Sequence, residues 1–431
     1  MKKRKLFLVA AIRSSIFRLV LAQGISLVGS RCTAFALGIW LFQQTGKTTE
    51  ILLIPFFQEV TVLLLNPFVG MIVDKFFRKT LMILADTVQA IGSVFLAVCI
   101  SLGMFTTTML YAVVIVQGLF ASLQGLAAEA TVAPLTHEGN RHRVNAVKEM
   151  LFPLAGIAAP AIAGLLFFRW GLVSVIAFDM VSFCVSMAIL GLARIPRVGQ
   201  ELSDAEQPEQ GNMEGFRYLK CHSYLLFFAV FFGLLNFLWN GPLELITPYL
   251  IASGVGPSML SLGMSLMSIG VLMGAAFLAV KNIGNRSTAL FILSIAWNGI
   301  WTFIFGVARE PILMIVALFF LMIPLPIAGA LFNTELQNRV PQQVQGRVFS
   351  IVYQISGGTA PLSFLLIGPL TDRVLTPMMS EGSAGLLHCI FGAGPQAGMG
   401  VVLALSGLLL LAMALLFSIQ QKGGKNRAAS V

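Results

Sequence analysis

Apolar stretches of about 20 residues recur along the whole chain, and they constrain the fold more than any other feature. About 20 helical residues are needed to cross a hydrocarbon core of about 30 Å. Twelve stretches are long enough, and none has the strict alternation of barrel strands. The predicted helices cover residues 17–43, 50–73, 80–103, 109–133, 145–168, 171–193, 223–249, 258–280, 287–307, 311–332, 348–370 and 398–419. The sequence therefore predicts an all-α integral membrane protein with twelve transmembrane helices.

Composition excludes most soluble classes of protein. The chain has 431 residues, of which only 11% are charged, against about 25% in soluble domains. Its five cysteines and four histidines are scattered, which predicts neither a disulfide framework nor a metal site. The tripeptide Gly46-Lys47-Thr48 lacks the upstream glycine of a phosphate-binding loop, since that position is Leu41. We therefore expect no enzyme activity, no cofactor and no metal.

The basic residues predict how the chain is oriented. With a cytoplasmic N-terminus, the inside segments hold 23 lysines and arginines. The outside loops then hold only Lys47, Arg169, Arg309 and Arg373. This asymmetry follows the positive-inside rule and predicts that both termini are cytoplasmic in a bacterial-type plasma membrane. It also explains the net charge of +10, so that no nucleic acid partner is expected.

A polar segment divides the chain into two halves. Residues 194–222 are rich in acidic residues, proline and glycine, and they predict a cytoplasmic linker between residues 1–193 and 223–431. A shift of 204 positions superimposes Gly29 on Gly233, Gly70 on Gly274 and Gly125 on Gly329. We therefore expect two pseudo-symmetric bundles of six helices, the second followed by a cytoplasmic tail.

A short polar turn follows the second predicted helix. The sequence GMIVDKFFRKTLMILAD contains Gly70, Asp74, Arg78 and Lys79. Glycine allows close helix approach, and the aspartate can accept hydrogen bonds from basic partners or face a helix N-terminus. Anchoring of the loop by its basic residues alone is the alternative.

This turn resembles the loop signature of the major facilitator superfamily, in which a glycine and an aspartate precede basic residues. Further stretches resemble the branch of macrolide-efflux and related drug/proton antiporters: FALGIWLFQQTG, NPFVGMIVDKFFRK, ARIPRVG, QNRVPQQVQGRVFSI and PLSFLLIGPLTDR. The resemblance implies the major facilitator fold, with a binding site near the middle of the membrane between the two bundles. It does not identify the substrate.

Arg31 is a permanent cation inside an apolar stretch, where it needs a partner, a cavity or a transport path. Counted from the cytoplasmic side, Arg31 and Glu59 lie at similar depths of about 20 and 22 Å. We therefore predict that they pair across the first two helices. A purely structural ion pair is one reading. In the other, Glu59 exchanges a proton while Arg31 stabilises its ionised form.

Polar side chains recur on several predicted helices and could line a substrate cavity. They are Gln117 and Gln124, then Asn236, Asn240 and Glu244 at four-residue spacing, and Tyr353 with Gln354. Hydrogen bonding between helices is the alternative role for these side chains.

The preferred prediction is a secondary transporter that exports an amphipathic small molecule, such as a macrolide-like drug, by alternating access and proton antiport. We expect it to act as a monomer surrounded by membrane lipid. Export of a siderophore or metabolite is one alternative, and a receptor or scaffold that does not transport is another.

Overall fold

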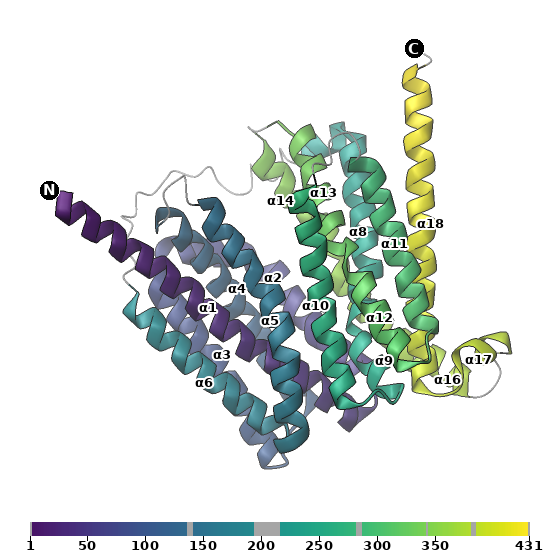
Figure 1. Cartoon of the computed structure of the whole chain (residues 1–431), viewed down its shortest axis with the longest axis horizontal. Helices are drawn as coiled ribbons and strands as arrows, with labels where there is room; N and C mark the ends of the chain where they lie inside the picture. The colour runs from purple at the N-terminus through teal and green to yellow at the C-terminus, as the bar shows by residue number, and fades with distance from the viewer. Residues whose placement is uncertain are drawn as a thin grey trace. The chain divides into compact units, whose positions relative to one another are not determined.

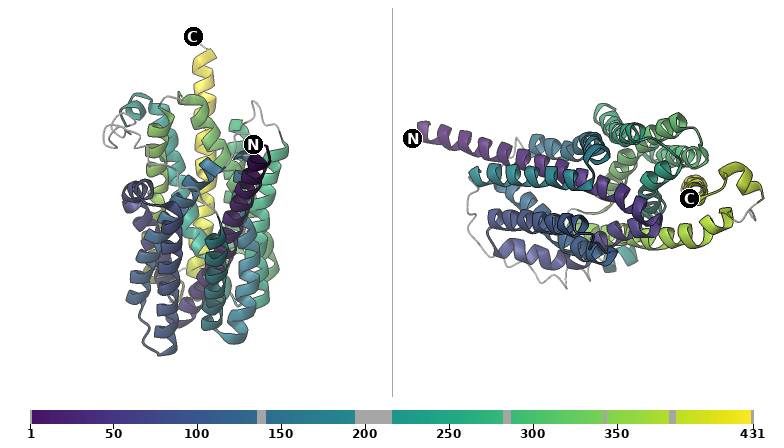
Figure 2. Two further views of the ribbon diagram at one scale, coloured as in Figure 1. Left: turned by 90° about the vertical axis from the view of Figure 1, so that its left-hand side faces the viewer. Right: turned by 90° about the horizontal axis from the view of Figure 1, so that it is seen from below.

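The computed structural model describes residues 2–135, 141–193, 216–281, 287–341, 344–380 and 385–429. Within these ranges every regular element is a helix (Figures 1 and 2). Twelve helical runs there are long and apolar enough to cross a membrane, and each overlaps one predicted span. The prediction of twelve transmembrane helices is therefore confirmed.

The chain divides into two compact units. The first comprises Met1–Gln44 and Ile54–Ser203, and the second comprises Thr45–Leu53 and Asp204–Val431. Helix α2 is therefore shared, since its first residues belong to the second unit. Of the predicted linker, residues 194–215 lie outside the described residues.

The first unit is a bundle of long helices. They are α1 (Lys2–Thr45), α2 (Thr48–Lys75), α3 (Arg78–Ser101), α4 (Thr107–Leu135), α5 (Arg141–Trp170) and α6 (Leu172–Leu192). Helix α3 packs on both α4 and α6, and α5 also packs on α6. The core is aliphatic, with Leu19, Val69, Met82 and Leu123 buried together.

The second unit is built from more and shorter helical pieces. They are α8 (Ser223–Glu244), α9 (Ile246–Ala252), α10 (Pro257–Val280), α11 (Ser287–Val307), α12 (Pro311–Met322), α13 (Pro324–Arg339), α14 (Gln345–Gly357), α15 (Thr359–Leu370), the π-helix η3 (Thr371–Leu375), α16 (Thr376–Ser380), α17 (Leu386–Phe391) and α18 (Pro395–Ala429). Its core is aromatic: Phe228 packs against the rings of Phe291, Phe332 and Phe417.

Prolines lie close to three of the breaks in the crossings of the second unit. Proline has no N–H to donate and its ring clashes with the preceding turn of a helix. Pro242 lies just before the break between α8 and α9, and Pro324 begins α13 directly after the end of α12. Pro369 precedes the π-helical turn η3.

Several helices extend beyond their predicted ends. The crossing predicted to stop at residue 370 continues to Ser380, because the polar residues of η3 stay helical. Helices α1 and α18 run well past 17–43 and 398–419, and the yellow end of α18 projects beyond its neighbour α11 (Figure 1).

Helices α11 and α18 pack together through glycines. A Cβ atom on Gly299 would lie 2.8 Å from the carbonyl oxygen of Gly407, and one on Gly306 would lie 2.7 Å from that of Gly400. Small residues allow backbones to approach closely, and the resulting van der Waals packing is one of the forces that drive helix association in membranes. This pair of helices therefore depends on the absence of side chains at the contact.

Gly407→Ala is expected to lower the stability of the protein by about 1–3 kcal/mol, because its Cβ would overpack the interface. That atom would lie 2.5 Å from the backbone nitrogen of Phe303, which cannot move aside freely. Gly329→Ala is the matched control, since no atom of the described residues lies within 4 Å of its Cβ position. Thermal unfolding in detergent measures both variants, and equal stability would contradict the packing described.

Candidate functional site

Arg31 contacts an aromatic ring on α5. Its guanidinium carbon lies 3.5 Å from the centre of the Phe152 ring, a cation–π geometry. Glu59, its predicted partner, is exposed on α2. The Arg31–Glu59 pair therefore stays a prediction.

The basic residues of the loop signature join the start of α3 to α4 and to the end of α6. Arg78 at the start of α3 donates to the carbonyl oxygen of Ala130 on α4 at 2.7 Å. Lys79 donates to the carbonyl oxygens of Gly191 and Ala193, at the end of α6, at 2.7 and 2.8 Å. The last carbonyls of a helix have no partner within the helix, and they attract cations. Gly70 lies in α2, and the Asp74 side chain is outside the described side chains.

A network of amides joins α3 to α4. Gln124 donates from its amide to Asp86 Oδ1 at 2.5 Å and accepts from Gln89 at 3.0 Å. Gln117 donates to the carbonyl oxygen of Gln89 and to Ser93 Oγ. These contacts match the interhelical alternative for Gln117 and Gln124, and their place in a substrate cavity stays a prediction. Asp86, only 1% exposed, was missed as a site by the sequence analysis.

The predicted polar side chains of the second unit have mixed surroundings. Asn236 donates to the carbonyl oxygen of Ser356 on α14 at 3.0 Å, and Asn240 donates back to Asn236 at 2.8 Å. Tyr353 donates to Asn333 Oδ1 at 3.0 Å. Glu244 is half-buried, and Gln354 is exposed. The polar side chains of α8 therefore serve in part to hold helices together, as the hydrogen bond from Asn236 to α14 shows.

The break between α12 and α13 is stabilised by two side chains of α11. Pro324 cannot donate to the carbonyl oxygen of Phe320, and Trp297 donates to it instead at 3.0 Å. Asn298 donates to the carbonyl oxygen of Leu321 at 2.8 Å. A lone asparagine in the apolar stretch of α11 was the sequence signal for this contact.

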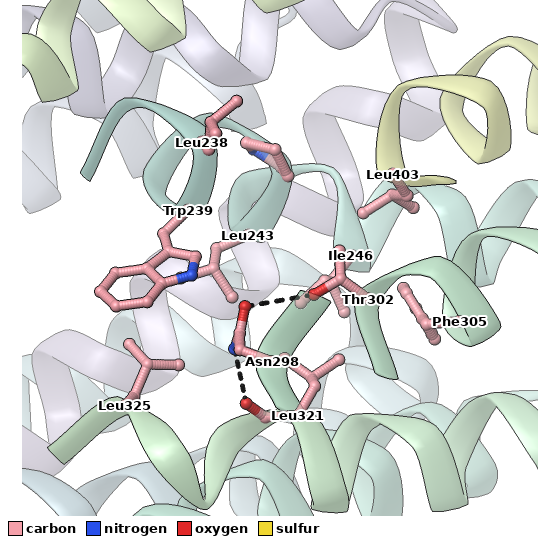
Figure 3. Close-up of a pocket in the computed structure, with 11 residues that line it drawn as sticks. Leu238, Trp239, Leu243, Ile246, Asn298, Thr302, Phe305, Leu321, Leu325 and Leu403 are labelled. Carbon is pink, nitrogen blue, oxygen red and sulfur yellow. Dashed lines mark hydrogen bonds between the residues drawn. The ribbon is translucent and has the colours of Figure 1, made fainter. Parts of the chain in front are cut away.

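A small cavity lies beside this break (Figure 3). It encloses about 20 Å³, room for about one water molecule, and is bordered by Trp239, Asn298 and Thr302 among apolar side chains. Trp239 Nε1 is buried and has no hydrogen-bond partner among the described residues. The cavity is therefore polar enough to hold water but too small for a drug-sized molecule.

One carboxylate of the second unit caps the start of α2. Asp372 accepts four hydrogen bonds of 2.5–3.0 Å, from the backbone N–H and the hydroxyl of both Thr48 and Thr49. The first N–H groups of a helix have no partner within it, and they carry the positive end of its dipole. Gly368 allows the approach, since a Cβ there would lie 2.8 Å from Thr49 Cα.

A second carboxylate with hydroxyl partners lies inside the first unit. Asp179 on α6 is 1% exposed and accepts a 2.8 Å hydrogen bond from Thr33 on α1. A lone aspartate within an apolar helix was the sequence signal, and the sequence analysis missed it. Intramembrane carboxylates are rare and usually functional.

Comparison with known proteins defines the family. The profile of the Major Facilitator Superfamily matches residues 19–363. Macrolide efflux protein A of Streptococcus pyogenes is 22% identical over 374 residues, which cover 85% of this chain and 92% of that protein. The Multidrug efflux pump Tap of Mycolicibacterium fortuitum is 23% identical over 359 residues, 80% of this chain and 86% of Tap.

Solved structures agree on the fold. The nucleoside transporter NupG superimposes with a TM-score of 0.69 at 12% identity, over 95% of this chain and 99% of that one. The D-xylose-proton symporter superimposes with a TM-score of 0.68 at 12% identity, over 92% of this chain and 96% of that one. The family match and the twelve apolar helices together define a multi-pass membrane transporter. The chain belongs to the major facilitator superfamily, which confirms the resemblance found in its sequence.

Asp372→Asn is expected to destabilise the protein by about 1–3 kcal/mol, because an amide can accept at only one of its two terminal atoms. Glu310→Gln is the matched control. Glu310 also precedes a helix, α12, but makes no side-chain capping bond. Thermal unfolding in detergent measures the difference, and equal losses in the two variants would contradict the cap.

Proposed function

We propose that this transporter exports an amphipathic small molecule of the macrolide or drug class by alternating access, driven by the inward flow of protons. The observation that carries the proposal is the similarity to two efflux proteins over at least 80% of this chain. We place it in a bacterial-type plasma membrane, with both termini cytoplasmic, as the distribution of basic residues indicates.

The proposed transport path follows from the sequence-based candidates. Half-buried Glu244 would attract the amine of a cationic drug, and exposed Gln354 is open to contact a ligand. The contacts of Arg78 and Lys79 link α3 to α4 and α6, so we propose that these helices move together during the cycle. We propose that the protein works as a monomer.

Cells that express the protein are expected to accumulate less of a macrolide or cationic dye than control cells, several-fold less for the preferred substrate. Collapse of the proton gradient by an uncoupler should abolish the difference, because the gradient supplies the driving force. Accumulation of a panel of dyes and macrolides is the measurement. A difference that survives the uncoupler would contradict proton coupling.

Unchanged accumulation of every compound would contradict drug export and favour a siderophore or metabolite exporter. If no exported compound of any class is found, a receptor or scaffold role gains support. A scaffold that does not transport would also keep its function when Asp74 and Glu59 are neutralised together. A transporter should instead lose substrate flux.

Glu59→Gln tests the coupling pair predicted from the sequence. If Glu59 exchanges the coupling proton, the variant should bind substrate but lose most of its gradient-driven efflux, at least tenfold. Glu310→Gln is the control, since its carboxylate lies outside the crossings. Efflux at the wild-type rate from a folded Glu59→Gln protein would assign the proton to another group.

A further inference from the structure

Asp179 is the one charged residue of α6 and lies well inside the crossing. It is seven residues from the start of α6, at a depth of about 10 Å along the helix. Its side chain is buried in the first unit, with 1% exposed. An ionised carboxylate away from water is unfavourable unless charge or hydrogen bonds compensate for the lost hydration.

The partners of Asp179 are neutral hydroxyl groups. Thr33 Oγ1 on α1 donates to Asp179 Oδ2 at 2.8 Å. Ser182 Oγ lies 3.5 Å from Oδ1, but makes its shorter bond, 2.7 Å, to the backbone carbonyl of Asp179. In the part of the chain that the structure describes, no basic side chain contacts Asp179.

The backbone of α1 closes the space around this carboxylate. A Cβ on Gly29 would lie 2.6 Å from Asp179 Oδ1 and 2.9 Å from Ser182 Cβ. Glycine therefore lets α1 lie directly against the carboxylate. Gly38, farther along the same helix, has nothing within 4 Å of its Cβ position.

The described contacts of the charged side chains on the helices beside α6 are with groups other than Asp179, whereas the Cys32 thiol on α1 interacts electrostatically with this carboxylate. On α1, the Cys32 thiol beside Thr33 donates to the carbonyl oxygen of Ala159 at 3.5 Å, and Arg31 lies over Phe152. The remaining described contacts are Arg18 with Leu192, Arg78 with Ala130, Lys79 with Gly191 and Ala193, Asp86 with Gln124, and Arg169 with Trp170. The charged side chains at 2–13 of α1 and at 141–149 of α5 lie outside the described side chains.

We propose that Asp179 is a proton-binding site of the transport cycle, distinct from Glu59. A proton taken from water forms an O–H bond on the carboxylate, and the same proton returns to water when that bond breaks. This proposal rests on the proposed proton-driven transport. Protonation of Asp179 neutralises a carboxylate that contacts no cation among the described side chains.

Thr33 couples the protonation of Asp179 to the position of α1 relative to α6. The ionised carboxylate is stabilised by the Thr33 hydroxyl, and that donor belongs to α1 rather than to α6. If α1 shifts along α6, the ionised form loses its shortest hydrogen bond and proton uptake becomes favourable. By linkage, proton uptake must then favour the shifted arrangement of the two helices. Asp372 differs from Asp179 in the number of its donors, because four hydrogen bonds from the start of α2 stabilise its carboxylate.

Infrared difference spectroscopy on the purified protein in lipid tests the proton site without any substrate. Among the carboxyl bands that appear as the pH is lowered, the C=O stretch of protonated Asp179 is expected in wild type and in Glu310→Gln. It should be missing in Asp179→Asn, which keeps an acceptor for Thr33 but cannot exchange a proton. If Asp179→Asn retains every titrating carboxyl band of wild type, the proposal is overturned.

Thr33→Val and Thr33→Ser keep the proposal testable if Asp179→Asn does not fold. Loss of the hydroxyl should move the titration of the carboxyl band to higher pH, and Thr33→Ser should restore the wild-type midpoint. An unmoved midpoint in Thr33→Val would overturn the role of this hydrogen bond.

Transport in proteoliposomes with an imposed pH gradient separates the two proposals. Asp179→Asn should lose gradient-driven accumulation of a dye that wild type carries, at least tenfold, while Glu310→Gln retains it. If the band is absent but the variant transports normally, Asp179 does not take part in coupling. If wild type shows the band but transports no compound of the panel, the proposed function fails and the proton site stands.

Discussion

The hydrocarbon interior offers no hydrogen-bond partners, so every polar group placed there has to be satisfied by the protein itself. This constraint organises the structure. Helices satisfy their own backbones, and where proline interrupts them side chains take over, as Trp297 and Asn298 do for α12. The same constraint makes the carboxylates of Asp86 and Asp179 informative, because each is held by neutral donors from a neighbouring helix.

Hydropathy was sufficient to predict the number and approximate ends of the crossings, because length and apolarity decide whether a helix can span a membrane. It could not predict the breaks and extensions of the second unit. The run from Thr371 to Ser380 stays helical although it begins with polar residues, and within it Asp372 has partners on α2 that are distant in sequence. Such a contact has no local signal.

The candidate site was predictable only in outline. The turn at Gly70–Lys79 identified the family, and its basic residues link helix ends. The roles of single side chains were harder to predict. Spacing along a helix shows which residues share a face, but not which neighbouring helix that face contacts. Gln117 and Gln124 thus contact α3. Asp179 is a lone acidic residue in an apolar helix, which was a signal in the sequence, but it belongs to no polar stripe and was not predicted as a site residue.

Family membership describes a transporter, and we propose that its buried carboxylates serve energy coupling. The most direct test is substrate-dependent proton movement across vesicles that contain only the purified protein and a trapped pH indicator. With an acidic interior, addition of a transported macrolide or dye is predicted to release protons from the vesicles at a rate that rises with its concentration. No proton movement with a compound that the same vesicles demonstrably accumulate would contradict proton-coupled export.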